Sequence, residues 1–124
     1  MGYSNNNKLV FDTLDLAIEK NPSAIPLFHS DRGYQYTSKA FKLKLDKVSA
    51  TQSMSRVGRC IDNGPIERFW GIIKSKMYCL RKFHNFYELK LAIDNYIEFY
   101  NNKRLQKKLK GLSPIEYRAQ TLTA

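Results

Sequence analysis

The segment from Asp62 to Lys74 constrains the fold most, because signals for a helix start are followed there by a helical apolar repeat. Asp62 and Asn63 are residue types that cap helix N-termini, and Pro65 suits the first turn, where its missing N–H costs nothing. Apolar side chains then recur at steps of three and four residues, which predicts a buried stripe formed by Ile66, Phe69, Trp70, Ile73 and Met77. The sequence therefore predicts an amphipathic helix.

A second face of this predicted helix carries Glu67 and Lys74, two turns apart, with Gly71 between them. The glycine leaves room for a large ligand. A carboxylate that binds a metal ion and an ammonium group that binds a phosphate backbone could be held apart in this way. The alternative is a surface helix on which Glu67 and Lys74 are ordinary solvated side chains, and the segment by itself favours that alternative.

A short apolar run from Ile25 to Ser30 is typical of a buried strand, and it ends at the carboxylate of Asp31. The chain then turns at Gly33 and enters a second helix capped by Thr37 or Ser38. Open α/β sheets place their chemistry at strand ends, so Asp31 is a candidate site residue. Strand alternation puts His29 on the same side as Asp31, and we interpret it as a packing residue rather than a metal ligand.

Helix and strand signals recur along the rest of the chain. A helix capped within Asn5–Asn7 runs to about Lys20, and an extended piece near 50–53 is expected to pair with the first strand. A long helix follows Asn85 and continues to about Asn102. The order Ser-Pro-Ile-Glu at 113–116 is a capping box that opens a short final helix.

Basic residues gather in two places outside these elements. Arg56 and Arg59 flank Gly58 in a segment, 54–63, whose Ser, Arg and Gly content predicts a mobile loop. That loop either closes over DNA with both arginines on phosphates or is simply solvated. A run without any acid contains five further cations: Lys103, Arg104, Lys107, Lys108 and Lys110.

Charge is distributed unevenly along the 124 residues. Residues 1–55 have seven Lys or Arg against five Asp or Glu, whereas residues 56–124 have fourteen against six, for a total of +10. This asymmetry favours a polyanionic partner that contacts mainly the second half. Cys60 and Cys79 are too few for a disulfide framework or a zinc site and are expected to be reduced in a cytoplasmic protein. No apolar run reaches membrane-spanning length.

Several ordered motifs together resemble one family. The order His29 to Ser38 (HSDRGYQYTS), then Gln52 to Arg56 (QSMSR), then Asp62-Asn63 before Glu67, is similar to the DDE transposases of bacterial insertion sequences, which belong to the retroviral-integrase superfamily. Asp31 and Glu67 are separated by 35 residues, the spacing of the second aspartate and the glutamate in that family. The stretch from Tyr96 to Arg118 also resembles the C-terminal end of these transposases, although Gln106 stands where many relatives carry a histidine.

The resemblance implies a fold and a chemistry. It implies an α/β, ribonuclease H-like catalytic core that is incomplete and helix-rich, with the first strands of its sheet missing. In intact relatives three carboxylates bind two divalent ions, Mg²⁺ or Mn²⁺, for phosphodiester cleavage and strand transfer. Asp31 and Glu67 match two of these catalytic and metal-binding positions, and Lys74 matches a phosphate-binding one. The first aspartate has no match, because Asp12 and Asp15 fall in the N-terminal helix.

The resemblance therefore predicts the C-terminal portion of a transposase catalytic domain, with a core remainder at about 8–84 and a basic helical extension at 85–124. Such a chain is expected to be inactive alone, to bind transposon-end and target DNA through Lys74, Arg56, Arg59, Lys107, Lys108 and Lys110, and to self-associate. One alternative is a non-catalytic DNA-binding or transposition-interfering protein. Another is an unrelated basic protein, for example one that binds RNA.

Overall fold

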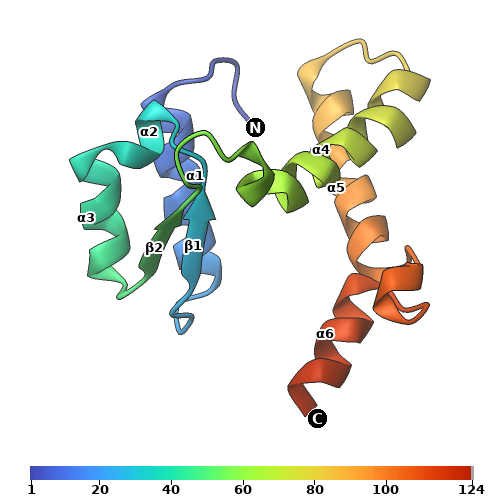
Figure 1. The fold of residues 1–124 in the computed structure, drawn as a ribbon. Helices are drawn as coiled ribbons and strands as arrows, with labels where there is room; N and C mark the ends of the chain where they lie inside the picture. The colour runs from blue at the N-terminus through green and yellow to red at the C-terminus, as the bar shows by residue number, and fades with distance from the viewer. Residues whose placement is uncertain (124) are drawn as a thin grey trace. The chain divides into compact units, whose positions relative to one another are not determined.

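The computed structural model describes residues 1–123 and consists of two compact units, Met1–Glu67 and the chain from Arg68 onward (Figure 1). The fold is α/β and rich in helix. Its elements in chain order are α1 (Asn7–Lys20), β1 (Leu27–Ser30), α2 (Tyr34–Thr37), α3 (Lys39–Lys47), β2 (Thr51–Met54), the 3-10 helix η1 (Cys60–Asn63), α4 (Gly64–Lys76), the 3-10 helix η2 (Tyr78–Leu80), α5 (Phe86–Asn102), the 3-10 helix η3 (Lys107–Leu109) and α6 (Pro114–Thr123).

A two-stranded parallel sheet lies at the centre of the first unit. β1 pairs with β2 from Leu27 opposite Thr51 to Ser30 opposite Met54, so the predicted pairing of these two segments is confirmed. Parallel strands need a long crossover, and α2 and α3 provide it here. Figure 1 shows the two arrows pointing the same way, with α1 and α3 beside them. Both strands therefore end at the same edge of the sheet.

The core of this unit forms on one face of the sheet, where α1 and α3 pack on β1. Phe41 is fully buried, and its ring lies 5.2 Å from that of Phe28 and 5.4 Å from that of Tyr36, in edge-on contacts. Leu45 of α3 and Leu14 of α1 are buried in the same cluster. These buried side chains lie on the inward faces of α1 and α3. Edge-on ring pairs of this kind add to the burial energy of the apolar side chains.

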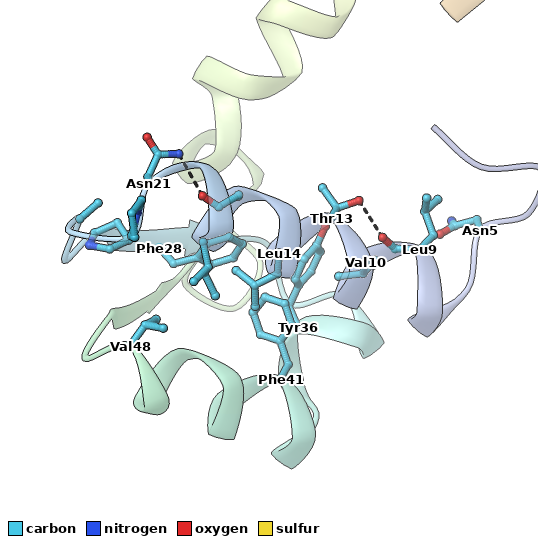
Figure 2. Close-up of a pocket in the computed structure, with 15 residues that line it drawn as sticks. Asn5, Leu9, Val10, Thr13, Leu14, Asn21, Phe28, Tyr36, Phe41 and Val48 are labelled. Carbon is cyan, nitrogen blue, oxygen red and sulfur yellow. Dashed lines mark hydrogen bonds between the residues drawn. The ribbon is translucent and has the colours of Figure 1, made fainter. Parts of the chain in front are cut away.

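An open apolar cavity of about 540 Å³ lies against this core. Its walls come from α1, from the chain leading into β1, and from the inward faces of β1, α2 and α3 (Figure 2). Figure 2 shows Leu14, Phe28, Tyr36 and Phe41 turned toward one another at this place. The first unit therefore leaves part of its apolar core accessible.

The segment 25–30 is more exposed than the sequence predicts. Ile25 and Leu27 are 75% and 67% exposed, and only Ser30 is buried within the strand. The prediction of a buried strand is therefore wrong for its first half. The physical reason is that β1 pairs only with β2, while the helices cover a single face, so side chains on the other face meet solvent.

A second cluster forms within the unit that begins at Arg68. Ile73 of α4 and Met77, the residue after α4, pack with Ala92 of α5, and the Phe69 ring lies 4.9 Å from the ring of Tyr100. The buried stripe predicted for α4 is correct at these α4 positions. It is wrong at Ile66 and Trp70, which are 44% and 46% exposed. The α5 residues of this cluster face Phe69, Ile73 and Met77, so the apolar stripe of α4 is wider than the surface that covers it.

Helix starts follow the predicted caps in most places. The side chains of Asn6, Ser38 and Asn85 accept backbone N–H bonds at the starts of α1, α3 and α5. The short helix α2 before Ser38 was not predicted, and part of the loop predicted at 54–63 is the 3-10 helix η1.

In the part of the chain that the structure describes, no helix is both long and apolar enough to cross a bilayer.

The core offers a matched test on one helix. Leu45 is 1% exposed and Leu43, two residues earlier, is 61% exposed. We expect Leu45→Ala to lower the free energy of unfolding by about 2–5 kcal/mol, because it leaves a cavity, whereas Leu43→Ala changes it by about 0.5 kcal/mol or less. Urea titration followed by circular dichroism measures both. Equal effects of the two substitutions would contradict this assignment of the core.

Candidate functional site

The first candidate residue, Asp31, follows directly on β1. Its side-chain Oδ1 accepts a hydrogen bond from the backbone N–H of Gly33 at 2.8 Å, which fixes the turn after the strand. A Cβ added at Gly33 would lie 2.9 Å from this same oxygen and 3.3 Å from the Tyr36 ring. The turn therefore needs glycine for space. The Asp31 side chain is exposed, as a ligand-binding carboxylate has to be.

The end of β2 lies beside the end of β1. The backbone N–H of Ser55 donates to the carbonyl of Ser30 at 2.9 Å, which extends the ladder by one residue. The Nε of Arg32 donates to the carbonyl of Ser55 at 2.8 Å. These bonds join the turn after β1 to the turn after β2. Asp31 and Arg56 therefore leave the sheet at neighbouring points.

His29 lies on the sheet face opposite the core, together with Ser53, its partner in the strand register. Its Nδ1 is 2.9 Å from the hydroxyl of Ser53, and its Nε2 is 3.1 Å from the backbone carbonyl of Asp62. Both ring nitrogens are thus occupied by the protein itself. This agrees with the interpretation of His29 as a packing residue rather than a metal ligand.

Asp62 and Arg56 form the most strongly paired charges in the chain that the structure describes. The Arg56 side chain donates from Nε to Oδ2 at 2.9 Å and from Nη2 to Oδ1 at 2.8 Å, and its backbone N–H also donates to Oδ2 at 3.0 Å. These bonds, first that of the guanidinium and then that of the backbone N–H, hold the pKa of the Asp62 carboxyl far below its usual range.

The predicted cap at Asp62 is therefore wrong, because its carboxylate binds Arg56 and η1 leads straight into α4. The loop is also less free than predicted, since Arg56 and Asp62 close it. Sequence reasoning missed this pair, and a basic and an acidic residue six positions apart in a loop give no recognised signal. Arg59 is exposed at the start of η1, and its contact with DNA, like that of Arg56, stays a prediction.

The face of α4 with Glu67 and Lys74 is open. Both side chains are exposed, and within residues 1–123 neither forms an ion pair or a side-chain hydrogen bond. A Cβ added at Gly71, between them, would meet no atom within 4 Å. No described atom therefore crowds α4 at Gly71, and ligand binding on this face stays a prediction.

A complete metal site is not formed by this chain. Among the described residues, no group of three or more His, Cys, Asp or Glu side chains is placed to hold a metal ion. Asp31 and Glu67 are two carboxylates, and a pair of divalent ions needs more oxygen ligands than two side chains supply. The described residues by themselves therefore do not fit the two-ion site.

A compact basic hook, residues 106–112, follows α5. The Gln106 carbonyl accepts from the N–H groups of Leu109 and Gly111 at 2.9 and 3.0 Å, and the Gln106 N–H donates to Leu112 at 3.1 Å. Lys110 and Gly111 close the hook with positive φ angles of 56° and 77°. The hook has three exposed lysines, Lys107, Lys108 and Lys110. None of them forms an ion pair with an Asp or Glu among the residues that the structure describes.

The hook ends in the predicted capping box. The Glu116 Oε2 accepts from the backbone N–H and from the hydroxyl of Ser113, both at 2.8 Å, while the Ser113 hydroxyl accepts from the Glu116 N–H at 3.4 Å. Ser113 is fully buried. The two Ser113 donors, the backbone N–H first, lower the pKa of the Glu116 carboxyl. The box therefore fixes the exit of the hook into α6.

Comparison with known proteins shows what this chain is similar to. The family described as "Integrase core domain" matches residues 67–122, the stretch from Glu67 through the hook into α6. The chain is a relative of the insertion-sequence transposases. No solved structure matches it. The two-stranded sheet and the helices of the structure agree with an α/β class for this relationship.

The relatives cover most of the chain but extend well beyond it. The putative transposase InsK for insertion sequence element IS150 of Escherichia coli K12 is 47% identical over 114 residues, which are 91% of this chain and 40% of that protein. A transposase-like protein of Haemophilus influenzae is 42% identical over 86% of this chain and 49% of its own length. The IS600 31 kDa protein of Shigella sonnei is 36% identical over 95% and 44%. The chain thus spans two fifths to one half of these relatives.

Glu116 allows a pH test of the capping box. The pKa of Glu116 is lowered in the folded state, so its ionised carboxylate stabilises the fold. This contribution to the free energy of unfolding is fully present above the unfolded pKa of about 4.3 and is lost as the pH falls through the folded pKa. We expect Glu116→Gln to weaken the loss of stability at acid pH. Glu98→Gln, on the exposed side of α5, is the control and should leave the acid limb unchanged. Thermal unfolding between pH 2 and pH 7 measures this.

Proposed function

We propose that this chain acts in DNA transposition, as part of an insertion-sequence transposase. The observation that carries this proposal is the similarity to proteins named transposases over 91% of the chain, together with the integrase core match at 67–122. The parallel strands, with Asp31 at the end of β1, support the finer proposal of a ribonuclease H-like core. The proposed partner is DNA at transposon ends and target sites.

Within such a protein, Asp31 and Glu67 are proposed to supply two of the carboxylates that bind Mg²⁺ or Mn²⁺, with further ligands from outside this chain. Asp31 and Glu67 would hold such ions jointly with those further ligands, and the ions would supply charge stabilisation for phosphodiester cleavage. The role of this chain is then to hold two exposed carboxylates. Lys74, two turns beyond Glu67 on the open face of α4, is proposed to contact a phosphate.

DNA binding is proposed to depend most on the hook. Some other lysines of the chain are paired: Lys42 and Lys90, for example, each bind an aspartate four residues further along at 2.7 Å. The hook lysines have no such partner among the described residues, so their full charge is available to a polyanion. A backbone closed by its own hydrogen bonds holds the three lysines close together, which suits contact with successive phosphates.

Salt dependence tests this proposal. We expect weak binding to DNA of any sequence, with log affinity falling linearly against log salt concentration. Replacing Lys107, Lys108 and Lys110 together with Ala should flatten this slope by up to about three units, if each lysine contacts one phosphate. Fluorescence anisotropy of a labelled duplex at several salt concentrations measures the slope.

A matched control removes the same charge elsewhere. Replacing Lys8, Lys42 and Lys90 with Ala also lowers the net charge by three, but each of these lysines is already paired with an aspartate. This variant should change the slope little. Equal slopes for the two triple variants would mean that DNA responds to overall charge and not to the hook. Glu67→Gln should leave affinity nearly unchanged, since it removes no phosphate contact.

Self-association is proposed through the free edge of β1. This strand pairs only with β2, and an unpaired edge with exposed apolar side chains is a template for association. Leu27, 67% exposed on this strand, is the side chain to change.

We expect Leu27→Lys to reduce concentration-dependent association in sedimentation velocity, because charge on an edge strand opposes pairing. Leu91→Lys is the control, since Leu91 is 61% exposed and belongs to a helix, α5, and not to a strand. Association that both substitutions reduce equally, or that neither reduces, would contradict a role for the β1 edge.

A further inference from the structure

We propose that His29 and Asp62 are positioning residues, which together latch the segment leading to Glu67 onto the strand end that carries Asp31. This proposal rests on the proposed function in one respect, namely that Asp31 and Glu67 belong to the same site. The latch itself is a feature of the fold. It consists of His29, Ser53, Asp62 and Arg56.

The imidazole of His29 joins three elements. A backbone carbonyl can only accept, so Nε2 of His29 donates to the Asp62 carbonyl at 3.1 Å. In the neutral ring Nδ1 then accepts from the Ser53 hydroxyl at 2.9 Å. His29 belongs to β1, Ser53 to β2 and Asp62 to η1. One side chain therefore ties both strands to the 3-10 helix that precedes α4.

Asp62 is fixed a second time through its carboxylate. Both carboxylate oxygens accept from the Arg56 guanidinium, and Oδ2 also accepts from the Arg56 backbone N–H. The Asp62 side chain is 19% exposed and that of Arg56 is 71% exposed. Two-point pairing of a guanidinium with a carboxylate fixes orientation as well as distance. The segment from Arg56 to Asp62 is therefore closed on itself and also held on the sheet by the Asp62 carbonyl.

Only a short stretch of chain separates each half of the latch from one of the two candidate carboxylates. His29 is two residues before Asp31, and Asp62 is five residues before Glu67. η1 ends at Asn63 and α4 begins at Gly64, so no flexible linker lies between the latch and Glu67. The latch thus sets where the first turn of α4 lies relative to the end of β1.

The pairing also presents Arg56 to a ligand. Arg56 uses Nε and Nη2 for Asp62, which leaves Nη1 for another acceptor on a side chain that stays largely exposed. A phosphate is the acceptor that suits this outward edge. Asp62 is then the residue that aims Arg56, and losing Asp62 should affect Arg56 and Glu67 together.

The position of Glu67 can be measured directly in the full chain. A nitroxide is attached at Glu67→Cys after Cys60→Ser and Cys79→Ser remove the native thiols, both of which are exposed. We expect paramagnetic broadening of the amide signals at 30–33 with the latch intact. His29→Ala and Asp62→Ala should each weaken that broadening. Asp46→Ala, which removes an exposed pair with Lys42, is the matched control and should not change it.

Hydrogen exchange gives a second readout that a general loss of stability would not reproduce. The Arg56 amide should exchange about fivefold faster in Asp62→Ala, because its acceptor is gone, while amides of α3 keep their protection. His29→Gln retains a donor for the Asp62 carbonyl and should restore broadening lost in His29→Ala. If Asp62→Ala does not fold, Asp62→Asn, which keeps the shape and loses the charge, is measured instead.

Unchanged broadening and unchanged Arg56 exchange in folded variants would overturn the latch. DNA binding of the same variants separates this outcome from failure of the proposed function. Variants that still bind DNA while broadening is lost support the latch and leave the proposed function intact. A parent chain that shows the broadening yet binds no DNA contradicts the proposed function alone.

Discussion

The parallel pairing of β1 with β2 is the constraint on which the rest of the first unit depends. Parallel strands end at one edge, so the turns after them are neighbours without any further interaction to bring them together. The ladder continues through the Ser55 N–H to Ser30, and Arg32 adds a bond to Ser55. The aspartate that ends β1 and the loop that leads to α4 consequently start from fixed positions at one edge.

For binding, it matters more whether a lysine forms an ion pair within the chain than how many lysines the chain has. In the first unit, Lys44 binds Asp15 at 2.7 Å and Lys42 binds Asp46, so each of these cations is offset by its partner. In the second half, three of the fourteen basic residues lie on a short hook that is closed by its own backbone hydrogen bonds. Exposed pairs contribute little to stability, whereas unpaired lysines held together create a local field for a polyanion. Pairing therefore decides which lysines can act in binding.

Local sequence signals were sufficient for the longer helices, for most of their caps and for the pairing of the two strands. Ser113 and Glu116 show the reason. A capping box depends only on two residues three positions apart, so it can be predicted from the sequence alone. The exposure of Ile66, Trp70 and Leu27 was not predictable, because burial depends on which surfaces are available to cover an apolar face. The bond from His29 to the Asp62 carbonyl joins residues 33 positions apart and involves backbone, which no side-chain pattern encodes.

The strand register has a consequence for how the chain folds. Leu27 pairs with Thr51, so β1 and β2 meet only after the intervening chain has closed into a loop, with the entropy cost that closure carries. The hook and α6 form from contacts between residues a few positions apart. Local structure generally forms faster than structure built on distant contacts. When the full-length chain refolds, the basic hook can therefore form before the sheet edge that carries Asp31 exists.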